Sequence, residues 1–436
     1  MTGARFRTSS GGKIFVEYSD ALPLFQFSLT LRSGSVFDPA GQEGLTRLMA
    51  RMWRMGTRRM SAEALEDKID ALGAQLSIGV GRTYMQVSVT TVERSLAPML
   101  ELVAHLLEAS SYRERDLAQQ KRETAAALEA ALDDDGAIAG RHFRRLALGD
   151  HPYGRAVTGT RNSLRSIDRG AVLRHVEQHL TGANALLGLS GPMEPQAARD
   201  LLEKHFGFLA HKPRPTLKVA MPKMPRGRRL VLVDKPERTQ TQVVIGTIGC
   251  RARDAEYVPL IVANTGFGGL FTSRLTTEVR AKRGWSYGAS SGFGHEPQRD
   301  LWTMRTAPAE KDARACVDLQ LSLLDRFIES GLSSKELKLS KNYLVKSHPF
   351  ESDTANKRLE HAMDQMIFDV PDEVHHRFPE LVAGVNRARA QEAVQKRISQ
   401  RDQLIVVVGT ASQLEPSLRD VPGLSSMDVV PFDAHW

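Results

Sequence analysis

The fold is indicated first by the stretch Phe25-Gln26-Phe27-Ser28-Leu29-Thr30-Leu31, in which apolar and polar residues alternate. Alternation with a period of two predicts a half-buried strand. A turn follows, and then the stretch Leu45-Thr46-Arg47-Leu48-Met49-Ala50-Arg51-Met52, whose leucines and methionines recur at helical spacing. An apolar stripe with arginines on the opposite face predicts an amphipathic helix.

The same order of strand and helix recurs in the second half of the chain. Residues 242–248 form an apolar run of strand length, and residues 257–264 form an apolar run that predicts a helix. Each half also closes with a buried strand that ends in glycine, at Gly191 and at Gly409, half a chain apart. The chain therefore carries an internal duplication.

A basic, proline-rich segment without hydrophobic period, residues 213–228, separates the two halves and predicts a linker. Runs of strands with helices laid over one face are typical of α+β domains. We predict an α+β protein of two homologous domains, residues 1–212 and 229–436, each a mostly antiparallel sheet covered by helices.

Composition excludes several classes of protein. The 436 residues carry a net charge of +8, but 51 acidic residues are interleaved with the basic ones and no nucleic-acid motif accompanies them. No run of apolar residues is long enough for a membrane span. The two cysteines, Cys250 and Cys316, form neither a disulfide framework nor a metal site. We expect a cytoplasmic protein, or a periplasmic one from which a signal peptide was removed.

Several short segments have the order and spacing of a known family. They are Gly44-Leu45 to Gly56-Thr57, Ala71-Leu72-Gly73-Ala74, Gly149-Asp150-His151-Pro152-Tyr153-Gly154-Arg155, Gly159-Thr160 and Gly268-Gly269-Leu270-Phe271-Thr272-Ser273-Arg274-Leu275. Together they resemble the pitrilysin/insulinase-type zinc metallopeptidases, the inverzincins, and in particular the branch of mitochondrial processing peptidase and its bacterial relatives. The resemblance implies that the two domains form half of a clam-shell chamber.

Active members of this family carry the helix motif H-x-x-E-H, in which two histidines bind zinc and the glutamate deprotonates the attacking water. The corresponding positions here are Arg47, Ala50 and Arg51. Arginine offers no lone pair to a metal, and alanine cannot act as a base. The resemblance places the third ligand, a glutamate on a later helix, at Leu128. The sequence thus predicts a degenerate zinc motif and no metal bound by this chain.

The resemblance also identifies Arg280 and Tyr287 as the arginine/tyrosine pair of the family's second domain. Gly284 predicts the end of the helix that contains Arg280, so that Tyr287 lies on the following strand and both side chains point into one cavity. A guanidinium and a phenol can donate hydrogen bonds to a substrate carbonyl and to the oxyanion formed from it. We expect this pair to bind substrate and stabilise the transition state.

Two further motifs have competing interpretations. Gly266, Gly268 and Gly269 resemble the family's glycine-rich loop, which lies near the substrate, and lack the residues of a nucleotide-binding loop. His175 and His179 stand four residues apart, as in a metal site, but their segment matches an ordinary helix before the closing strand of the first half. We interpret these histidines as structural.

The sequence therefore predicts a non-catalytic subunit of a heterodimeric zinc metalloendopeptidase, inactive alone. It would supply binding and transition-state residues to the zinc site of a homologous H-x-x-E-H partner, which holds the zinc and acts on peptides. One alternative is a structural core-type subunit of a larger complex without a proteolytic role. Another is a stand-alone peptidase with a relocated metal site.

Overall fold

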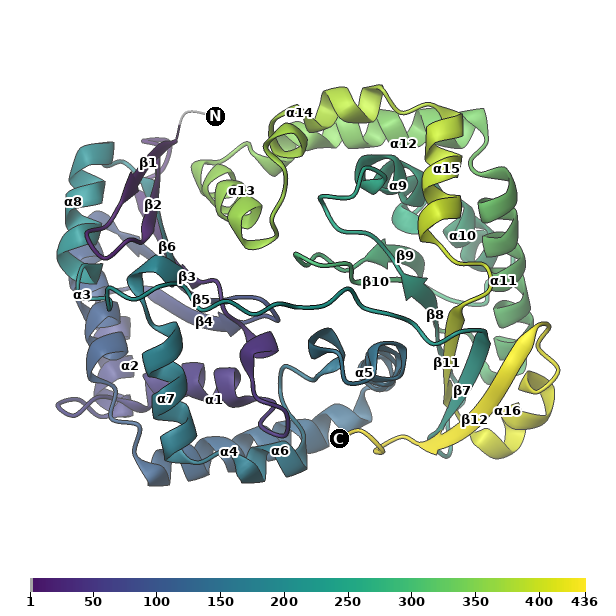
Figure 1. Ribbon diagram of the computed structural model, residues 1–436, viewed down its shortest axis with the longest axis horizontal. Coiled ribbons are helices and arrows are strands. Elements are labelled where there is room, and N and C mark those ends of the chain that lie inside the picture. Colours follow the sequence, from purple (N-terminus) through teal and green to yellow (C-terminus); the bar gives the residue numbers. More distant parts are fainter. Residues whose placement is uncertain (1–2) are drawn as a thin grey trace. The chain divides into compact units, whose positions relative to one another are not determined.

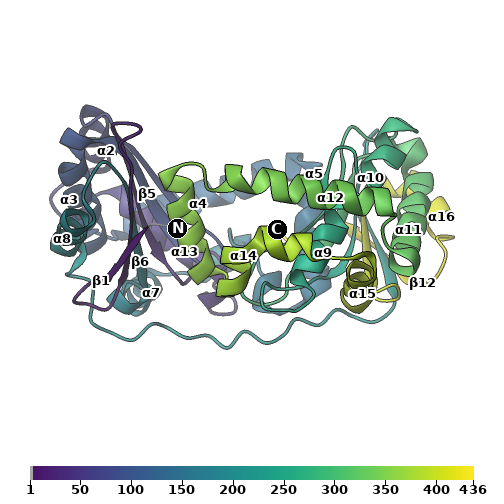
Figure 2. The ribbon, with the colours of Figure 1, turned by 90° about the horizontal axis from the view of Figure 1, so that it is seen from above.

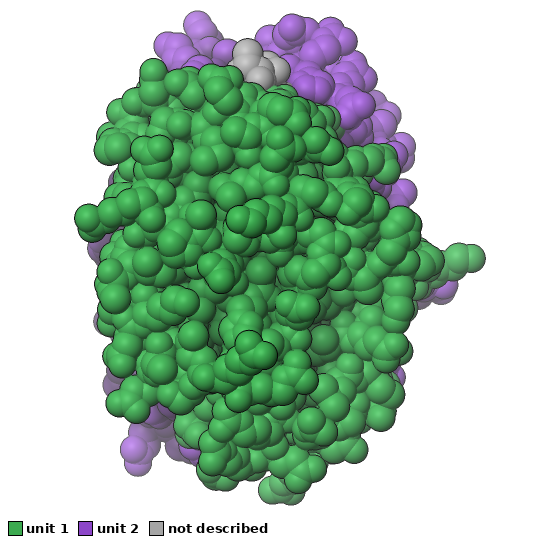
Figure 3. Space-filling view, turned by 90° about the vertical axis from the view of Figure 1, so that its left-hand side faces the viewer, with its two compact units in different colours: residues 1–128, 156–218, 350–367 green, residues 129–155, 219–349, 368–436 purple. Residues whose placement is uncertain are grey.

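A computed structural model of the protein describes residues 3–436 and divides them into two compact units (Figure 3). Unit 1 comprises the described part of residues 1–128 together with residues 156–218 and 350–367. Unit 2 comprises residues 129–155, 219–349 and 368–436. Each unit therefore includes a segment from the opposite half of the chain, which the predicted halves 1–212 and 229–436 did not anticipate.

The described residues of each unit form a six-stranded sheet (Figure 1). The strands of unit 1 are β1 (Ala4–Arg7), β2 (Lys13–Tyr18), β3 (Leu24–Leu31), β4 (Gln75–Val80), β5 (Met85–Val92) and β6 (Ala185–Gly191). Those of unit 2 are β7 (Arg228–Asp234), β8 (Gln242–Ile248), β9 (Ala289–Phe293), β10 (Leu301–Thr306), β11 (Gln403–Gly409) and β12 (Leu424–Pro431).

The two sheets share a five-stranded topology. Unit 1 has the order β1-β2-β6-β3-β5-β4 and unit 2 the order β12-β7-β11-β8-β10-β9. In both sheets the second and third strands of this order are parallel, and the pairs that follow are antiparallel. Only the edge strand differs, because β1 is antiparallel to β2 whereas β12 is parallel to β7. The predicted α+β class, the duplication and the mostly antiparallel sheets are confirmed.

Helices pack on these sheets. The helices of the first half are α1 (Leu45–Met52), α2 (Ala62–Ala71), α3 (Glu93–Ala109), α4 (Glu114–Ala130), α5 (Asp135–Leu148), α6 (Arg161–Ser166), α7 (Arg169–His179) and α8 (Pro195–Phe206). Those of the second half are α9 (Tyr257–Asn264), α10 (Arg274–Thr276), α11 (Ala313–Ser330), α12 (Ser334–Ser347), α13 (Ala355–Ile367), α14 (Asp372–Ala383), α15 (Arg387–Arg397) and α16 (Ala411–Leu418).

Strand β3 is buried on both faces, although its sequence alternates between apolar and polar residues. Phe27 faces α8, where its ring stacks on Phe206 with centroids 5.0 Å apart. The next residue, Ser28, faces the other way and lies 3.3 Å from the Sδ of Met363 on α13. Figure 2 shows α3 and α8 on one side of these strands and α13 on the other. The prediction of a half-buried strand was wrong, because a helix from the second half of the chain covers the second face.

The exchange of helices is reciprocal. Helix α13, from the second half, packs on β2 and β6, and helix α5, from the first half, packs on β8 and β11. Glycines allow the close approach: a Cβ on Gly188 would lie 2.6 Å from the Met363 Sδ, and one on Gly246 would lie 2.9 Å from the Phe143 ring. Each sheet is thus completed by the other half of the sequence.

Three other predictions concern the chain as a whole. Residues 213–227 of the predicted linker contain no helix or strand, while Arg228 begins β7. Cys250 and Cys316 are buried free thiols, in agreement with the absence of a disulfide framework. Among the described helices, none combines the length and the apolar character that crossing a membrane requires.

Candidate functional site

The first element of the candidate site, helix α1, is anchored at its N-terminus by a buried carboxylate. Asp38 accepts hydrogen bonds from the backbone N–H groups of Gly44 and Thr46, at 2.8 and 2.9 Å, and from the Thr46 hydroxyl at 2.5 Å. Gly44 precedes the helix at φ +96°, a conformation that favours glycine. Burial raises the pKa of Asp38 to about 7, although its hydrogen bonds act in the opposite direction.

The residues at the zinc-motif positions line a cavity of about 310 Å³. Arg47, Ala50 and Arg51 form its α1 side, together with Gln120 from α4 and residues 78–80 of β4. The predicted apolar stripe of α1 is confirmed, since Leu45, Leu48, Met49 and Met52 are buried in the core. The helix therefore points its arginines into a cavity and its leucines and methionines away from it.

The two arginines in this cavity have different surroundings. Arg51 donates from Nε to the Gln120 side chain and from Nη2 to Glu123, at 2.8 Å. The Nε of Arg47 is buried and has no hydrogen-bond partner within residues 3–436. Burial, and to a lesser degree the charge of Arg51, lowers the pKa of Arg47. Arg51 is thus neutralised within unit 1, and Arg47 remains without a carboxylate partner among the described residues.

The resemblance assigned the third zinc ligand to a position that lies away from this cavity. Leu128 is buried and does not line the cavity. The α4 residues that contact Arg51 are Gln120 and Glu123, which spacing along the sequence did not single out. The sequence signal that could have identified them is their separation of three residues, which places both side chains on one face of α4.

A zinc ion does not fit the side chains of this cavity. Two guanidinium groups occupy the places of the ligating imidazoles, and neither offers a lone pair. Both would repel a divalent cation. Ala50, at the place of the glutamate, carries no group that could take a proton from water.

His175 and His179 lie in the core, as interpreted from the sequence. Both side chains are buried, their ring centroids are 4.2 Å apart, and the Nε2 of His175 lies 2.8 Å from the Thr46 hydroxyl oxygen. Burial lowers the pKa of His175 to about 3 and that of His179 to about 4, so both rings are neutral near pH 7. Within residues 3–436, no three His, Cys, Asp or Glu side chains are grouped so that they could hold a metal ion.

The second element of the candidate site brings Arg280 and Tyr287 together. The Cζ of Arg280 lies 4.7 Å from the centroid of the Tyr287 ring and 4.1 Å from that of Phe271. The guanidinium is thus stacked with two aromatic rings, an arrangement that holds its plane while leaving its N–H groups free to donate. Tyr287 is 88% exposed and Phe271 is 70% exposed.

Local backbone geometry creates this stack. Arg280 lies in a π-helical turn, Thr277–Ala281, that continues α10. Gly284 then adopts φ +66°, and its N–H donates to the Arg280 carbonyl at 3.0 Å, so the predicted helix stop is confirmed. The chain reverses and returns Tyr287 to Arg280. Tyr287 precedes β9 instead of lying on it, which corrects the predicted strand position.

Phe271 is the member of this stack that sequence reasoning missed. It follows the glycines of the predicted glycine-rich loop. The sequence around it, Leu270-Phe271-Thr272, has no periodicity that would distinguish an exposed aromatic residue from a core residue. Only the fold places its ring on Arg280.

The glycine-rich segment itself is not a loop. Thr265–Gly269 forms a π-helical turn that extends α9, and Gly266 and Gly268 are buried. A Cβ on Gly266 would lie 2.6 Å from the Ser340 Oγ, and one on Gly268 would lie 2.8 Å from the Ser291 backbone nitrogen. These two glycines are needed for packing. Gly269, which is exposed, has no such contact.

Comparison with known protein families matches two consecutive parts of this chain. Residues 16–161 match the family described as insulinase (peptidase family M16), and residues 166–344 match the domain described as the peptidase M16 inactive domain. The two matches together span most of the chain and meet within the first half, between α5 and α7.

Individual relatives agree with this result. An uncharacterized zinc protease, YmxG of Bacillus subtilis, is 21% identical over 355 residues, which cover 81% of this chain and 86% of that protein. The mitochondrial-processing peptidase subunit beta of Lentinula edodes is 23% identical over 249 residues, 54% of this chain and 51% of that subunit. The crystal structure of a peptidase M16 inactive domain from Pseudomonas fluorescens has a TM-score of 0.87 at 21% identity and covers 94% of this chain and 98% of its own.

Proposed function

Because this chain belongs to the insulinase family of peptidases, family M16, we propose that it is the non-catalytic subunit of a heterodimeric zinc metalloendopeptidase. The family assignment agrees with the resemblance identified from the sequence. The residues at the zinc-motif positions support this role, because Arg47, Ala50 and Arg51 can neither bind zinc nor take a proton from water. A homologous subunit with an intact H-x-x-E-H helix would hold the zinc ion.

The observation that carries the proposal is the exposed stack of Arg280 and Tyr287. No carboxylate pairs with Arg280 and no group accepts from the Tyr287 hydroxyl among residues 3–436, so both keep unused hydrogen-bond donors. Exposed donors that are held in place by stacking are suited to an acceptor on another molecule. In this role Arg280 binds a carbonyl of the peptide, and Tyr287 donates to the oxyanion that develops at the scissile bond.

Arg51 of α1 has a separate role. Arg51 is occupied by Gln120 and Glu123, so its charge is balanced within unit 1 and is not offered to a substrate. Its ion pair replaces the metal as the link between α1 and α4. This arrangement suits a subunit that retains the fold of a peptidase after losing the zinc ligands.

Reconstitution with a homologous zinc subunit tests the proposal. Tyr287→Phe removes one hydroxyl and keeps the ring on Arg280, so turnover of the heterodimer should fall roughly tenfold to a thousandfold, as it does when an oxyanion donor is lost. The matched control is Tyr343→Phe, which alters an exposed tyrosine in the same unit that does not contact Arg280.

The outcome also separates this function from a structural core-type subunit. A structural subunit would support assembly with either tyrosine variant and would leave turnover unchanged in both. Equal turnover of the Tyr287→Phe and unaltered heterodimers would therefore refute the catalytic contribution of this chain.

A further inference from the structure

Four cations share one face of the sheet in unit 1. Arg5 and Arg7 on the edge strand β1 lie opposite Phe15 and Lys13 on β2, so all four of these side chains point to the same side. Lys13 and Thr30 are both paired with Leu186 of β6, which brings Arg32, two residues beyond Thr30, to that side as well. We call Arg5, Arg7, Lys13 and Arg32 the basic face.

Among residues 3–436, no carboxylate balances the charge at the centre of the basic face. The polar contact of the Lys13 Nζ is the Sδ of Met366, at 3.6 Å. Burial, followed by the charges of Arg32, Arg7 and Arg5, lowers the pKa of Lys13. Arg32 donates from Nη2 to a backbone carbonyl at 2.8 Å, whereas its buried Nε has no hydrogen-bond partner in the described part of the chain. Like charges this close are mutually destabilising unless an anion joins them.

A carboxylate on the same strand does not serve this purpose. Glu17 of β2 lies on this side of the sheet but is buried and paired with Arg358 of α13, at 3.1 Å. Its charge is therefore already matched, and it leaves the basic face positive.

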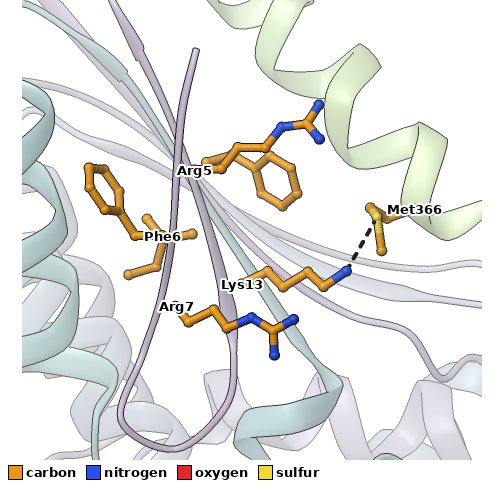
Figure 4. Close-up of a pocket in the computed structure, with 7 residues that line it drawn as sticks. Arg5, Phe6, Arg7, Lys13 and Met366 are labelled. Atoms are coloured by element: carbon orange, nitrogen blue, oxygen red, sulfur yellow. Dashed lines mark hydrogen bonds between the residues drawn. The ribbon is translucent and has the colours of Figure 1, made fainter. Parts of the chain in front are cut away.

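The basic face borders a cavity of about 440 Å³ between the β1–β2 hairpin and α13, lined by Arg5, Phe6, Arg7, Lys13, Ile14, Phe15 and Met366. Figure 4 shows the Lys13 side chain extended toward Met366, with Arg5 and Arg7 on either side of it. The guanidinium of Arg5 lies 5.6 Å from the centroid of the Phe15 ring. The cationic groups thus lie beside two apolar side chains on the same side of the sheet, those of Phe15 and Met366.

From this arrangement we propose that the basic face binds an acidic segment of a peptide, with its side-chain carboxylates on Arg5, Arg7 and Lys13. Residues two apart on a strand are spaced like alternate side chains of an extended peptide, so one acidic segment can contact several of the cations. Phe15 and Met366 offer apolar contact to neighbouring hydrophobic side chains. That this peptide is a substrate of the heterodimer rests on the proposed function. Binding of an acidic peptide does not, because it can be measured with this chain alone.

The test is fluorescence anisotropy with the purified full-length chain. The probe is a labelled, end-blocked peptide with glutamates at alternate positions between leucines, and its neutral counterpart has glutamines in their place. We expect the glutamate peptide to bind at least tenfold more tightly than the glutamine peptide, and its affinity to fall as sodium chloride is raised.

Two variants locate the site. The double substitution Arg5→Gln/Arg7→Gln removes two exposed charges and should weaken binding of the glutamate peptide about tenfold or more, since contacts to charged groups are strong. The matched control, Arg58→Gln/Arg59→Gln, removes two exposed charges elsewhere in unit 1 and should change affinity less than twofold.

Three results would overturn the proposal. They are equal affinities for the two peptides, equal losses in the two double variants, and displacement of the peptide by an equal concentration of inorganic phosphate, which would identify a site for a free anion. None of them bears on the Tyr287→Phe experiment, because that measurement reads turnover with the zinc subunit present.

Discussion

Arg51 in unit 1 and Arg280 in unit 2 differ in their hydrogen-bond and charge partners. In unit 1, Arg51 is hydrogen-bonded to Gln120 and Glu123 on α4, so the Glu123 carboxylate balances its charge within the unit. In unit 2, Arg280 has no carboxylate partner among the described residues and is stacked between two exposed rings. An arginine that is paired locally contributes to the fold, and one that is oriented but unpaired can contribute to binding. The difference predicts that Arg280 contributes to turnover and that Arg51 does not.

The strongest test of this comparison replaces each arginine by alanine and measures turnover with a homologous zinc subunit. Arg280→Ala removes the donors that we propose bind the substrate and should lower turnover about a hundredfold, because such contacts are strongest where charge develops. Arg51→Ala should lower turnover less than threefold, since its donors are occupied within unit 1. Similar losses in both variants would erase the distinction between the units.

A second test compares the glycines beneath the exchanged helices. Gly246→Ala should lower the free energy of unfolding by about 3 kcal/mol, because its Cβ would lie 2.2 Å from the backbone oxygen of Trp302, which cannot move without shifting β10. Gly188→Ala should cost about 1 kcal/mol, because its Cβ meets the flexible side chain of Met363.

Urea denaturation of the two glycine variants measures this difference. Equal decreases in the free energy of unfolding would mean that both sheets relax around an added methyl group to the same extent. The packing of α5 and of α13 would then be equally tolerant.

A third test is the pH dependence of stability at the start of α1. Burial holds the pKa of Asp38 at about 7, above the ordinary 3.8, so the folded state keeps a proton that the unfolded chain releases. The stability from this proton is full below about pH 4 and is lost as pH rises through 7. His175, whose pKa is lowered to about 3, acts in the opposite direction below its ordinary value.

The contribution of Asp38 is isolated by subtraction. The free energy of unfolding of the unaltered chain minus that of Asp38→Asn should decrease between pH 4 and pH 7, because His175 titrates in both proteins. A difference that increases over this range would show that the hydrogen bonds from Gly44 and Thr46 outweigh burial and keep Asp38 ionised.

Sequence alone determined the elements and much of the chemistry. Alternation in residues 25–31, helical spacing in residues 45–52 and the glycine-ended closing strands are local properties, and local backbone sterics and side-chain periodicity decide them. The loss of the zinc ligands was equally readable, because arginine and alanine lack the required lone pairs and proton acceptor wherever they lie.

Only the tertiary structure decided which distant residues meet. The helix exchange and the partners of Arg51 depend on segments far apart in the sequence, whose pairing follows from burial of complementary faces. The glycine-rich segment was misjudged as a loop for the same reason, since the contacts of Gly266 and Gly268 come from β9 and α12. Periodicity reports the conformation of a segment, whereas its neighbours are chosen by packing, which no local pattern encodes.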